Sequence, residues 1–251
     1  MAAHYDTYDY PAYWSGRDYE HKAEIEALKA FLKKIPKIKS ILEIGAGFGR
    51  LVPSYSYRGK KVILSDPSLK LLSQARLRLT QRKIRFLHSK VENLAKKLDK
   101  ESLDLIICVR VIHHIKDIEQ TFKIINRLLK NRGYLILEFA NKSHFKASLS
   151  QLIRGNITFP LDIFPSDRRS KKSLKNKTLP FLNYHPEVIK NKLEDNGFTI
   201  VETRSVSNIR SSTLKKFISC DALISIEKNL QLPLGSVNFG PSIFLLAQKR
   251  I

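Results

Sequence analysis

The 251-residue chain has few cysteines and no long apolar run. Its two cysteines, Cys108 and Cys220, form no C-x-x-C pair and no ligand cluster, so the sequence predicts neither a disulfide framework nor a metal site. We interpret both as reduced thiols of a cytoplasmic protein. No apolar run has the length of a transmembrane segment, and the tyrosine-rich, acidic N-terminus does not resemble a signal peptide.

The chain is also short of acidic residues, with 23 against 45 lysines and arginines, which gives a formal charge of +22. The charge is uneven, because residues 1–26 are acidic whereas residues 166–177 form a dense basic cluster. A basic surface attracts polyanions such as RNA, anionic lipid headgroups or acidic metabolites. Aromatic residues are not interleaved with the basic cluster, as a single-strand binding surface would require. RNA is therefore an alternative partner and not the main prediction.

Strand-like and helix-like segments alternate along the first 140 residues. Apolar runs predict strands at 40–44, 61–64, 84–87, 103–109 and 134–139, and helical spacing predicts helices at 23–34, from 68, and at 117–131. The run at 103–109 is apolar throughout, as expected for a central parallel strand buried on both faces. Repeated β-α units predict an α/β fold with a parallel sheet and right-handed crossovers.

The second part of the chain is less regular. Residues 140–184 form a long, basic segment that we expect to be irregular, and either functional or disordered. The pattern returns with predicted helices at 186–196 and 214–230 and predicted strands at 198–204 and 242–248.

The region between residues 41 and 66 contains the most specific pattern in the chain. The run ILEIGAGFGRL, at 41–51, passes from a buried strand into Gly45, Gly47 and Gly49, which let the backbone turn sharply and approach a ligand. Asp66 ends the next apolar run about twenty residues after Gly45, the spacing of an acidic side chain that accepts hydrogen bonds from ribose hydroxyls. This arrangement predicts a nucleotide-type cofactor site.

Two other nucleotide motifs do not fit this region. A dinucleotide fingerprint, G-x-G-x-x-G, needs glycine where the chain has Arg50, and a P-loop needs G-K-[ST]. Glu43, two residues before the first glycine, would repel pyrophosphate but suits a cofactor with an ammonium and a sulfonium group. The pattern E-x-G-x-G-x-G therefore favours S-adenosylmethionine.

With these residues the chain resembles the class I S-adenosylmethionine-dependent methyltransferases, and among them the small-molecule and quinone-biosynthesis C-methyltransferases. The resemblance implies a Rossmann-like, mostly parallel seven-stranded sheet with helices on both faces and an antiparallel C-terminal strand at its edge. It implies one domain over residues 1–251, with an N-terminal cap at 1–37 and a cofactor-binding half at 38–140. The substrate-side half, at 141–251, would contain a basic insertion at 141–184.

The resemblance also assigns cofactor-binding roles. The residues that would surround the methionine part of the cofactor are Glu43, Gly45, Ala46, Gly47 and Gly49. Asp66 would bond the ribose, and Pro67 and Ser68 would lie near the adenine edge. The alternative for the glycines is a tight strand-to-helix turn without a ligand.

The segment after the third predicted strand departs from the family pattern G-D-A-E-x-L-P. Lys90 stands where the family has aspartate, and a lysine cannot accept a hydrogen bond from the adenine amine. The main chain of Val91, or Glu92 after a shift, would then hold the adenine, and cofactor binding would be altered.

The segment VRVIHHI, at 109–115, resembles the family's segment at the carboxyl end of strand four, where ligands of open α/β sheets bind. Val109 and Arg110 would approach the cofactor. His113 or His114 could act as a general base, because imidazole titrates near neutral pH. Structural packing is the alternative for each histidine.

The N-terminal stretch at 8–19 is dense in aromatic residues, and similar segments in the family fold over the cofactor. Tyr13 and Trp14 would attract the sulfonium by cation–π interaction, and Arg17 would bind the cofactor carboxylate. The alternative is an aromatic contact against the edge of the sheet.

We therefore predict an S-adenosylmethionine-dependent methyltransferase that acts on a small molecule. One alternative is an RNA methyltransferase, which the positive charge favours. Against it, the chain has no N-P-P-Y motif and no Pro-Cys pair. The other is a non-catalytic cofactor-binding homologue, which Lys90 suggests. The sequence specifies neither the methyl acceptor nor the oligomeric state.

Overall fold

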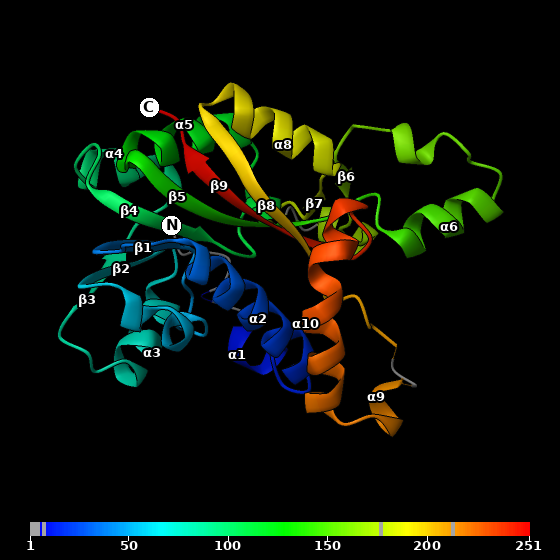
Figure 1. Cartoon of the computed structure of the whole chain (residues 1–251), viewed down its shortest axis with the longest axis horizontal. Helices are drawn as coiled ribbons and strands as arrows, with labels where there is room; N and C mark the ends of the chain where they lie inside the picture. Colours follow the sequence, from blue (N-terminus) through cyan, green and yellow to red (C-terminus); the bar gives the residue numbers. More distant parts are fainter. Residues whose placement is uncertain (1–5, 7–8, 176–177, 212–213) are drawn as a thin grey trace.

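The computed structural model describes residues 6, 9–175, 178–211 and 214–251 and contains a seven-stranded sheet (Figure 1). Its strands are β1 (Ser40–Ile44), β2 (Lys61–Asp66), β3 (Ile84–His88), β4 (Leu103–Cys108), β5 (Leu129–Ala140), β8 (Phe198–Val206) and β9 (Ser242–Lys249). They lie in the order β3-β2-β1-β4-β5-β9-β8. β1 to β5 pair in parallel, and β9 is antiparallel to both of its neighbours. The predicted, mostly parallel α/β sheet is confirmed.

The C-terminal strand lies inside the sheet. β9 is antiparallel, as predicted, but the edge position was wrong, because β9 pairs with β5 on one side and with β8 on the other. Its apolar residues from Ile243 to Ala247 are all buried, as expected for a strand with neighbours on both sides and helices on both faces. β8 forms the edge.

Helices cover both faces of the sheet (Figure 1). One face carries α1 (Tyr10–Tyr13), α2 (Asp18–Lys34), α3 (Leu69–Arg78) and α10 (Cys220–Ser236), and the other carries α4 (Leu94–Lys97), α5 (Ile118–Leu128) and α8 (Pro186–Asp195). Polar side chains cap several of these helices at their starts. Ser68 accepts a hydrogen bond from the N–H of Leu71, and Asp117 accepts one from the N–H of Gln120.

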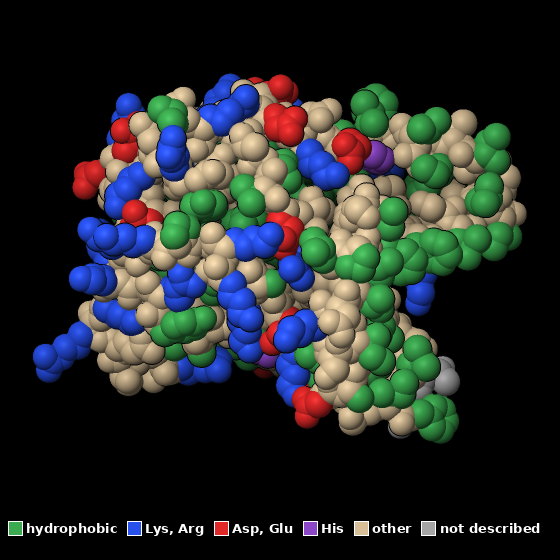
Figure 2. Space-filling model, in the orientation of Figure 1, with side chains coloured by type: hydrophobic (Ala, Val, Ile, Leu, Met, Phe, Trp, Pro, Cys, Tyr) green, Lys and Arg blue, Asp and Glu red, His purple; other side chains and the backbone are tan. Residues whose placement is uncertain are grey.

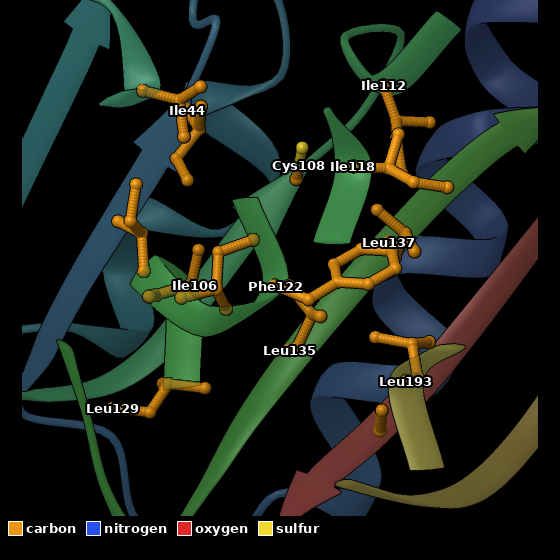
Figure 3. Close-up of a cluster of buried hydrophobic side chains, with 14 of the residues drawn as sticks. Ile44, Ile106, Cys108, Ile112, Ile118, Phe122, Leu129, Leu135, Leu137 and Leu193 are labelled. Carbon is orange, nitrogen blue, oxygen red and sulfur yellow. The ribbon is translucent and has the colours of Figure 1, made fainter. Parts of the chain in front are cut away.

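One hydrophobic core lies between the sheet and the helices α4, α5 and α8. Ile106 of β4, Leu137 of β5 and Phe122 of α5 meet in it (Figure 3). A second core, on the opposite face, packs α2 against the central strands. Because the central strands are buried on both faces, their carboxyl ends are held at fixed positions relative to one another.

Predicted helix boundaries differ from the structure at several places. The helix predicted at 23–34 begins earlier, at Asp18. The helix predicted at 117–131 ends at Leu128, because Leu129 pairs with Leu103 and starts β5.

The helix predicted at 214–230 is two helices. α9 (Leu214–Phe217) ends before Ser219, whose side chain accepts a hydrogen bond from the N–H of Ala222 and caps α10. Because the N-cap residue of a helix has a non-helical backbone conformation, Ser219 interrupts the helix that the sequence predicts.

Residues 141–184 contain more structure than the sequence predicted. Their elements are α6 (Phe145–Ile153), η6 (Phe159–Leu161), β6 (Ser166–Asp167), α7 (Lys171–Lys175) and β7 (Leu182–Asn183). α6 and the chain that follows it project away from the sheet (Figure 1), and we call residues 145–164 the apolar arm. Lys177, the last residue of the predicted basic cluster, lies outside the described residues. No helix of the described part is long and apolar enough to cross a membrane.

Candidate active site

Asp66 ties three neighbouring strands together at their carboxyl ends. Its Oδ2 accepts a hydrogen bond from the N–H of Gly47 at 2.8 Å, and its Oδ1 accepts one from the N–H of Ser68 at 2.7 Å. Its main-chain carbonyl accepts a hydrogen bond from the N–H of Ser89, just after β3. Burial raises the pKa of Asp66 to about 6. Asp66, the residue predicted to bind the ribose, therefore lies directly against the predicted glycine loop.

The glycine loop, residues 45–49, needs its glycines both for conformation and for space. Gly45, Gly47 and Gly49 have φ angles of 69°, 55° and 78°, in the left-handed region. A Cβ on Gly45 would collide with the side chain of Val111, and a Cβ on Gly49 would lie 2.6 Å from a methyl carbon of Leu79. Gly45 therefore lets the end of β1 approach the segment after β4.

Glu43 has a partner that the sequence did not indicate. Its carboxylate accepts a hydrogen bond from the hydroxyl of Tyr55 at 2.5 Å, and both side chains are buried. Tyr55 lies between the short 3-10 helices η2 (Val52–Ser54) and η3 (Ser56–Arg58). Burial raises the pKa of Glu43 to about 7. The cofactor-binding roles of Glu43 and of the buried Ala46 stay predictions.

The segment expected to hold adenine follows β3. Lys90 and Glu92 are exposed, whereas Val91 is buried at the start of the 3-10 helix η4 (Val91–Asn93). The main chain at Val91 is therefore close to the strand ends while the Lys90 side chain meets solvent. The adenine roles of these three residues stay predictions.

Pro67 and Ser68 join Asp66 to α3 and to the N-terminus. The Ser68 hydroxyl donates to the carboxylate of Asp6 at 2.6 Å, and the Pro67 carbonyl is hydrogen-bonded to the His88 ring at 2.9 Å. Their place near the adenine edge of the cofactor stays a prediction.

Arg110, directly after β4, has a strained backbone and a mostly buried charge. Its φ of 59° lies in the left-handed region, which residues other than glycine rarely adopt. Its N–H donates to Oε2 of Glu138 on β5 at 2.7 Å, and its Nε donates to Oε1 of Glu24 on α2 at 2.6 Å. Backbone strain of this kind is concentrated at functional sites. Val109, its predicted partner in cofactor binding, is buried beside it.

Glu24 joins Arg110 to the glycine loop. Its other oxygen accepts a hydrogen bond from Nη2 of Arg50 at 2.5 Å, and only 1% of its side chain is exposed. Although burial opposes ionisation, the guanidinium groups of Arg110 and Arg50 hold the pKa of Glu24 below its usual range. We call residues 45–49, Asp66, Arg110 and Glu24 the strand-end site.

Sequence reasoning missed both buried glutamates. Glu24 lies four residues before Leu28 on the buried face of α2, so the helical spacing could have identified it. Glu138 is the only acid in the predicted strand YLILEF, at 134–139, and an acid within a buried strand is a similar signal.

Aromatic side chains of the N-terminal segment cover the buried charges. The guanidinium carbons of Arg50 and Arg110 lie 3.6 Å and 4.8 Å from the centroid of the Trp14 ring. The guanidinium carbon of Arg17 lies 4.1 Å from the centroid of the Tyr13 ring. The predicted aromatic residues are thus at the site, but their rings already contact arginines. Their contacts with a cofactor stay predictions.

The same segment lies against the glycine loop. The Tyr10 ring is 3.7 Å from the position that a Cβ on Gly47 would occupy. It also meets the Phe48 ring edge-on, with centroids 6.0 Å apart. Tyr8, at the start of the predicted aromatic stretch, lies outside the described residues.

His113 and His114 differ in their surroundings, although their rings are only 4.1 Å apart. His113 is buried, and its Nδ1 has no hydrogen-bond partner within the described part of the chain. Burial, together with the nearby His114 and Arg110, holds the pKa of His113 well below its usual range. Nδ1 of His114 is hydrogen-bonded to the carbonyl of Pro180, and the Phe181 ring packs against His113. His113 is therefore a neutral imidazole whose Nδ1 is unpartnered among the described residues.

Comparison with known proteins gives one family match. A family model described as a methyltransferase domain matches residues 42–137, from β1 to β5. A ubiquinone biosynthesis O-methyltransferase of Pelagibacter ubique (strain HTCC1062) is 29% identical over 111 residues, which are 44% of this chain and 45% of that protein. The chain spans about half the length of the curated relatives it matches.

Solved structures share the fold over nearly the whole chain. An S-adenosylmethionine-dependent methyltransferase from Mesorhizobium loti has a TM-score of 0.60 and 18% identity, and the match covers 90% of this chain and 98% of that one. A magnesium protoporphyrin IX methyltransferase from Synechocystis PCC 6803, with bound SAH, has a TM-score of 0.57 and 20% identity over 92% of this chain and 84% of that one. At these identities the structures show the fold alone.

Proposed function

Because residues 42–137 place this chain among the class I S-adenosylmethionine-dependent methyltransferases, we propose that it transfers a methyl group from S-adenosylmethionine to a small-molecule acceptor. The cofactor of this family is S-adenosylmethionine. The acceptor and the roles of individual residues are our proposals.

The position of Asp66 against Gly47 supports the proposal most strongly. Each carboxylate oxygen of Asp66 accepts one main-chain hydrogen bond and keeps a lone pair for a ribose hydroxyl. Burial raises the pKa of Asp66 to about 6, which indicates that the two main-chain donors do not fully compensate the loss of water. Two further hydroxyl donors would stabilise the ionised carboxylate, so the site fits the ribose.

We propose that Arg17 binds the cofactor carboxylate. The guanidinium groups of Arg50 and Arg110 are already paired with Glu24, whereas the described contact of Arg17 is with the Tyr13 ring. A guanidinium above an aromatic ring keeps its N–H groups available for a carboxylate. The aromatic residues of α1 would exclude water from this side of the cofactor.

When bound, the cofactor supplies a methyl group on a sulfonium sulfur, already activated toward displacement. Alignment of the acceptor can therefore supply much of the rate. We propose that Nδ1 of His113 takes the proton of the acceptor, because this nitrogen has no hydrogen-bond partner among the described residues. His114, bonded to Pro180, would hold the neighbouring wall in place.

A base at His113 favours an acceptor with a weakly acidic hydroxyl group. The Pelagibacter ubique relative is named for methyl transfer to oxygen. We therefore propose an oxygen acceptor, although the proteins that the sequence resembles include C-methyltransferases and the sequence itself left the target atom open.

Isothermal titration with S-adenosylhomocysteine tests the proposal. We expect wild-type protein to bind it, and Asp66→Ala to weaken binding by ~1–3 kcal/mol, about 5- to 150-fold, because buried hydrogen bonds are lost. The control is Asp99→Ala, since Asp99 is exposed and lies just before the amino end of β4, whereas the site is at the carboxyl ends of the strands. Affinity should also fall as the pH drops through 6, where Asp66 becomes protonated.

Two results would overturn the proposal. If the wild-type protein bound no S-adenosylhomocysteine, the proposed cofactor site would be wrong. If Asp66→Ala and Asp99→Ala bound it with equal affinity, the role proposed for Asp66 would be wrong.

A further inference from the structure

The apolar arm exposes more large apolar side chains than any other segment of similar length in the described part of the chain. They are Phe145, Leu149, Leu152, Ile153, Ile157, Leu161, Ile163 and Phe164, and they are between 42% and 78% exposed. The first four lie at helical spacing, so α6 presents one apolar face. Figure 2 shows hydrophobic side chains along the edge of the projection that α6 forms in Figure 1. A contiguous surface of this kind marks an interaction site.

The rest of the molecule covers little of this surface. Phe145 stacks on Phe239 with ring centroids 4.9 Å apart, which anchors the base of the arm. Between α6 and residues 156–160 lies a shallow cavity of about 200 Å³, lined by Leu149, Leu152 and Ile157 among others. The outer side chains, such as Ile153, remain in solvent. The apolar surface therefore needs an external partner to be buried.

Basic residues lie beside the apolar surface, and the acids there are neutralised. Between residues 145 and 175 there are seven lysines and arginines and two acids. Asp162 pairs with the buried Lys142, and Asp167 pairs with Arg169. Arg168 and Lys171 are exposed. The region thus combines exposed apolar side chains with a net positive charge.

We propose that the apolar arm binds the surface of an anionic lipid bilayer. An amphipathic helix with a basic surround lies in the bilayer interface, where its apolar face enters the acyl boundary and its basic residues meet the headgroups. RNA would use the basic residues but would leave the isoleucines and leucines in water. A groove-shaped protein partner fits less well, because the apolar residues project outward on both α6 and the following turn.

A later part of the same insertion contacts the candidate active site. Pro180 and Phe181 contact His114 and His113. Binding to a bilayer does not depend on the proposed methyl transfer, so the two proposals can fail separately.

Flotation with vesicles tests the proposal on the full chain. We expect the wild type to float with phosphatidylcholine vesicles that contain 30% phosphatidylglycerol. Ile153→Asp/Ile157→Asp should float about ten-fold less, because two apolar side chains no longer enter the interface. The matched control is Tyr57→Asp/Leu77→Asp, which makes the same charge change at two exposed apolar residues outside the arm and should float like the wild type. Unchanged circular dichroism shows that each variant is folded.

A second pair of variants tests the charge. Arg168→Glu/Lys171→Glu should lose binding to anionic vesicles several-fold more than Lys60→Glu/Lys100→Glu, which has the same net charge and changes exposed lysines far from the arm. Equal losses in the two pairs would overturn the proposal, because the overall charge alone would then explain binding.

Four other results would also overturn it. The wild type could fail to float with anionic vesicles, or Ile153→Asp/Ile157→Asp could float as well as the wild type. Light scattering could show a wild-type dimer that Ile153→Asp/Ile157→Asp dissociates without any vesicle binding, and a second copy of the chain would then cover the arm. Bulk RNA that binds the wild type more tightly than vesicles, and that Ile153→Asp/Ile157→Asp no longer binds, would make RNA the partner.

Discussion

The strand-end site and the apolar arm lie after the carboxyl ends of neighbouring strands, but the first buries charged side chains and the second exposes them. At the strand-end site, Glu24 is buried between Arg50 and Arg110, and Asp66 is buried against the glycine loop. The arm keeps its charges in solvent and exposes eight large apolar side chains. Buried charges require fixed partners, whereas exposed apolar groups await a partner from outside. The first region therefore suits the proposed cofactor, and the second suits the proposed bilayer surface.

The two regions should differ most in the stability that is lost when a carboxylate is removed. Glu24→Gln leaves two mostly buried guanidinium groups without their carboxylate, so we expect a loss of about 3–5 kcal/mol in the free energy of unfolding. Urea denaturation followed by circular dichroism would measure it. Asp167→Asn, just after the arm in the sequence, removes the exposed partner of Arg169 and should change the unfolding midpoint far less. Similar midpoints for the two variants would contradict the comparison.

A smaller difference is expected between glycines that share a backbone conformation. Gly45 and Gly155 both have positive φ, at 69° and 81°. A Cβ on Gly45 would meet Val111, whereas a Cβ on Gly155 would meet nothing within 4 Å. Gly155→Ala should therefore cost only the backbone strain, ~1 kcal/mol, and Gly45→Ala about 2 kcal/mol more, because the Val111 side chain must move. Thermal unfolding of both variants measures the difference, and equal losses would show that the glycine loop is not tightly packed.

The sequence singled out several residues that the structure brings together at the strand-end site. Gly45, Gly47 and Asp66 are recognisable because a sharp turn and the predicted ribose contact each require a particular residue at a particular spacing. Their roles toward a cofactor stay predictions. The strands were predicted well because continuous apolar runs have few other interpretations. The helices at 117–131 and 214–230 were extended too far, because tertiary pairing of Leu129 and the capping role of Ser219 are not local properties.

What the sequence did not show depends on contacts between distant residues. Glu24 meets Arg110 across 86 positions, and Asp66 meets Gly47 only after two strands have paired. The surroundings of the His113 ring, whose Nδ1 has no partner among the described residues, also depend on packing against the distant Phe181. In the arm, the apolar spacing of α6 is visible in the sequence, but whether that face is buried or exposed is not.

Amide hydrogen exchange with and without S-adenosylhomocysteine tests the central claim most directly, because it reports on both regions in one experiment. The account predicts slower exchange in residues 9–17, 44–49 and 66–68 when the ligand is added, and unchanged exchange in residues 145–164. Protection confined to residues 145–164, with no change at the glycine loop, would contradict it, because the cofactor would then bind at the arm and not at the ends of the strands.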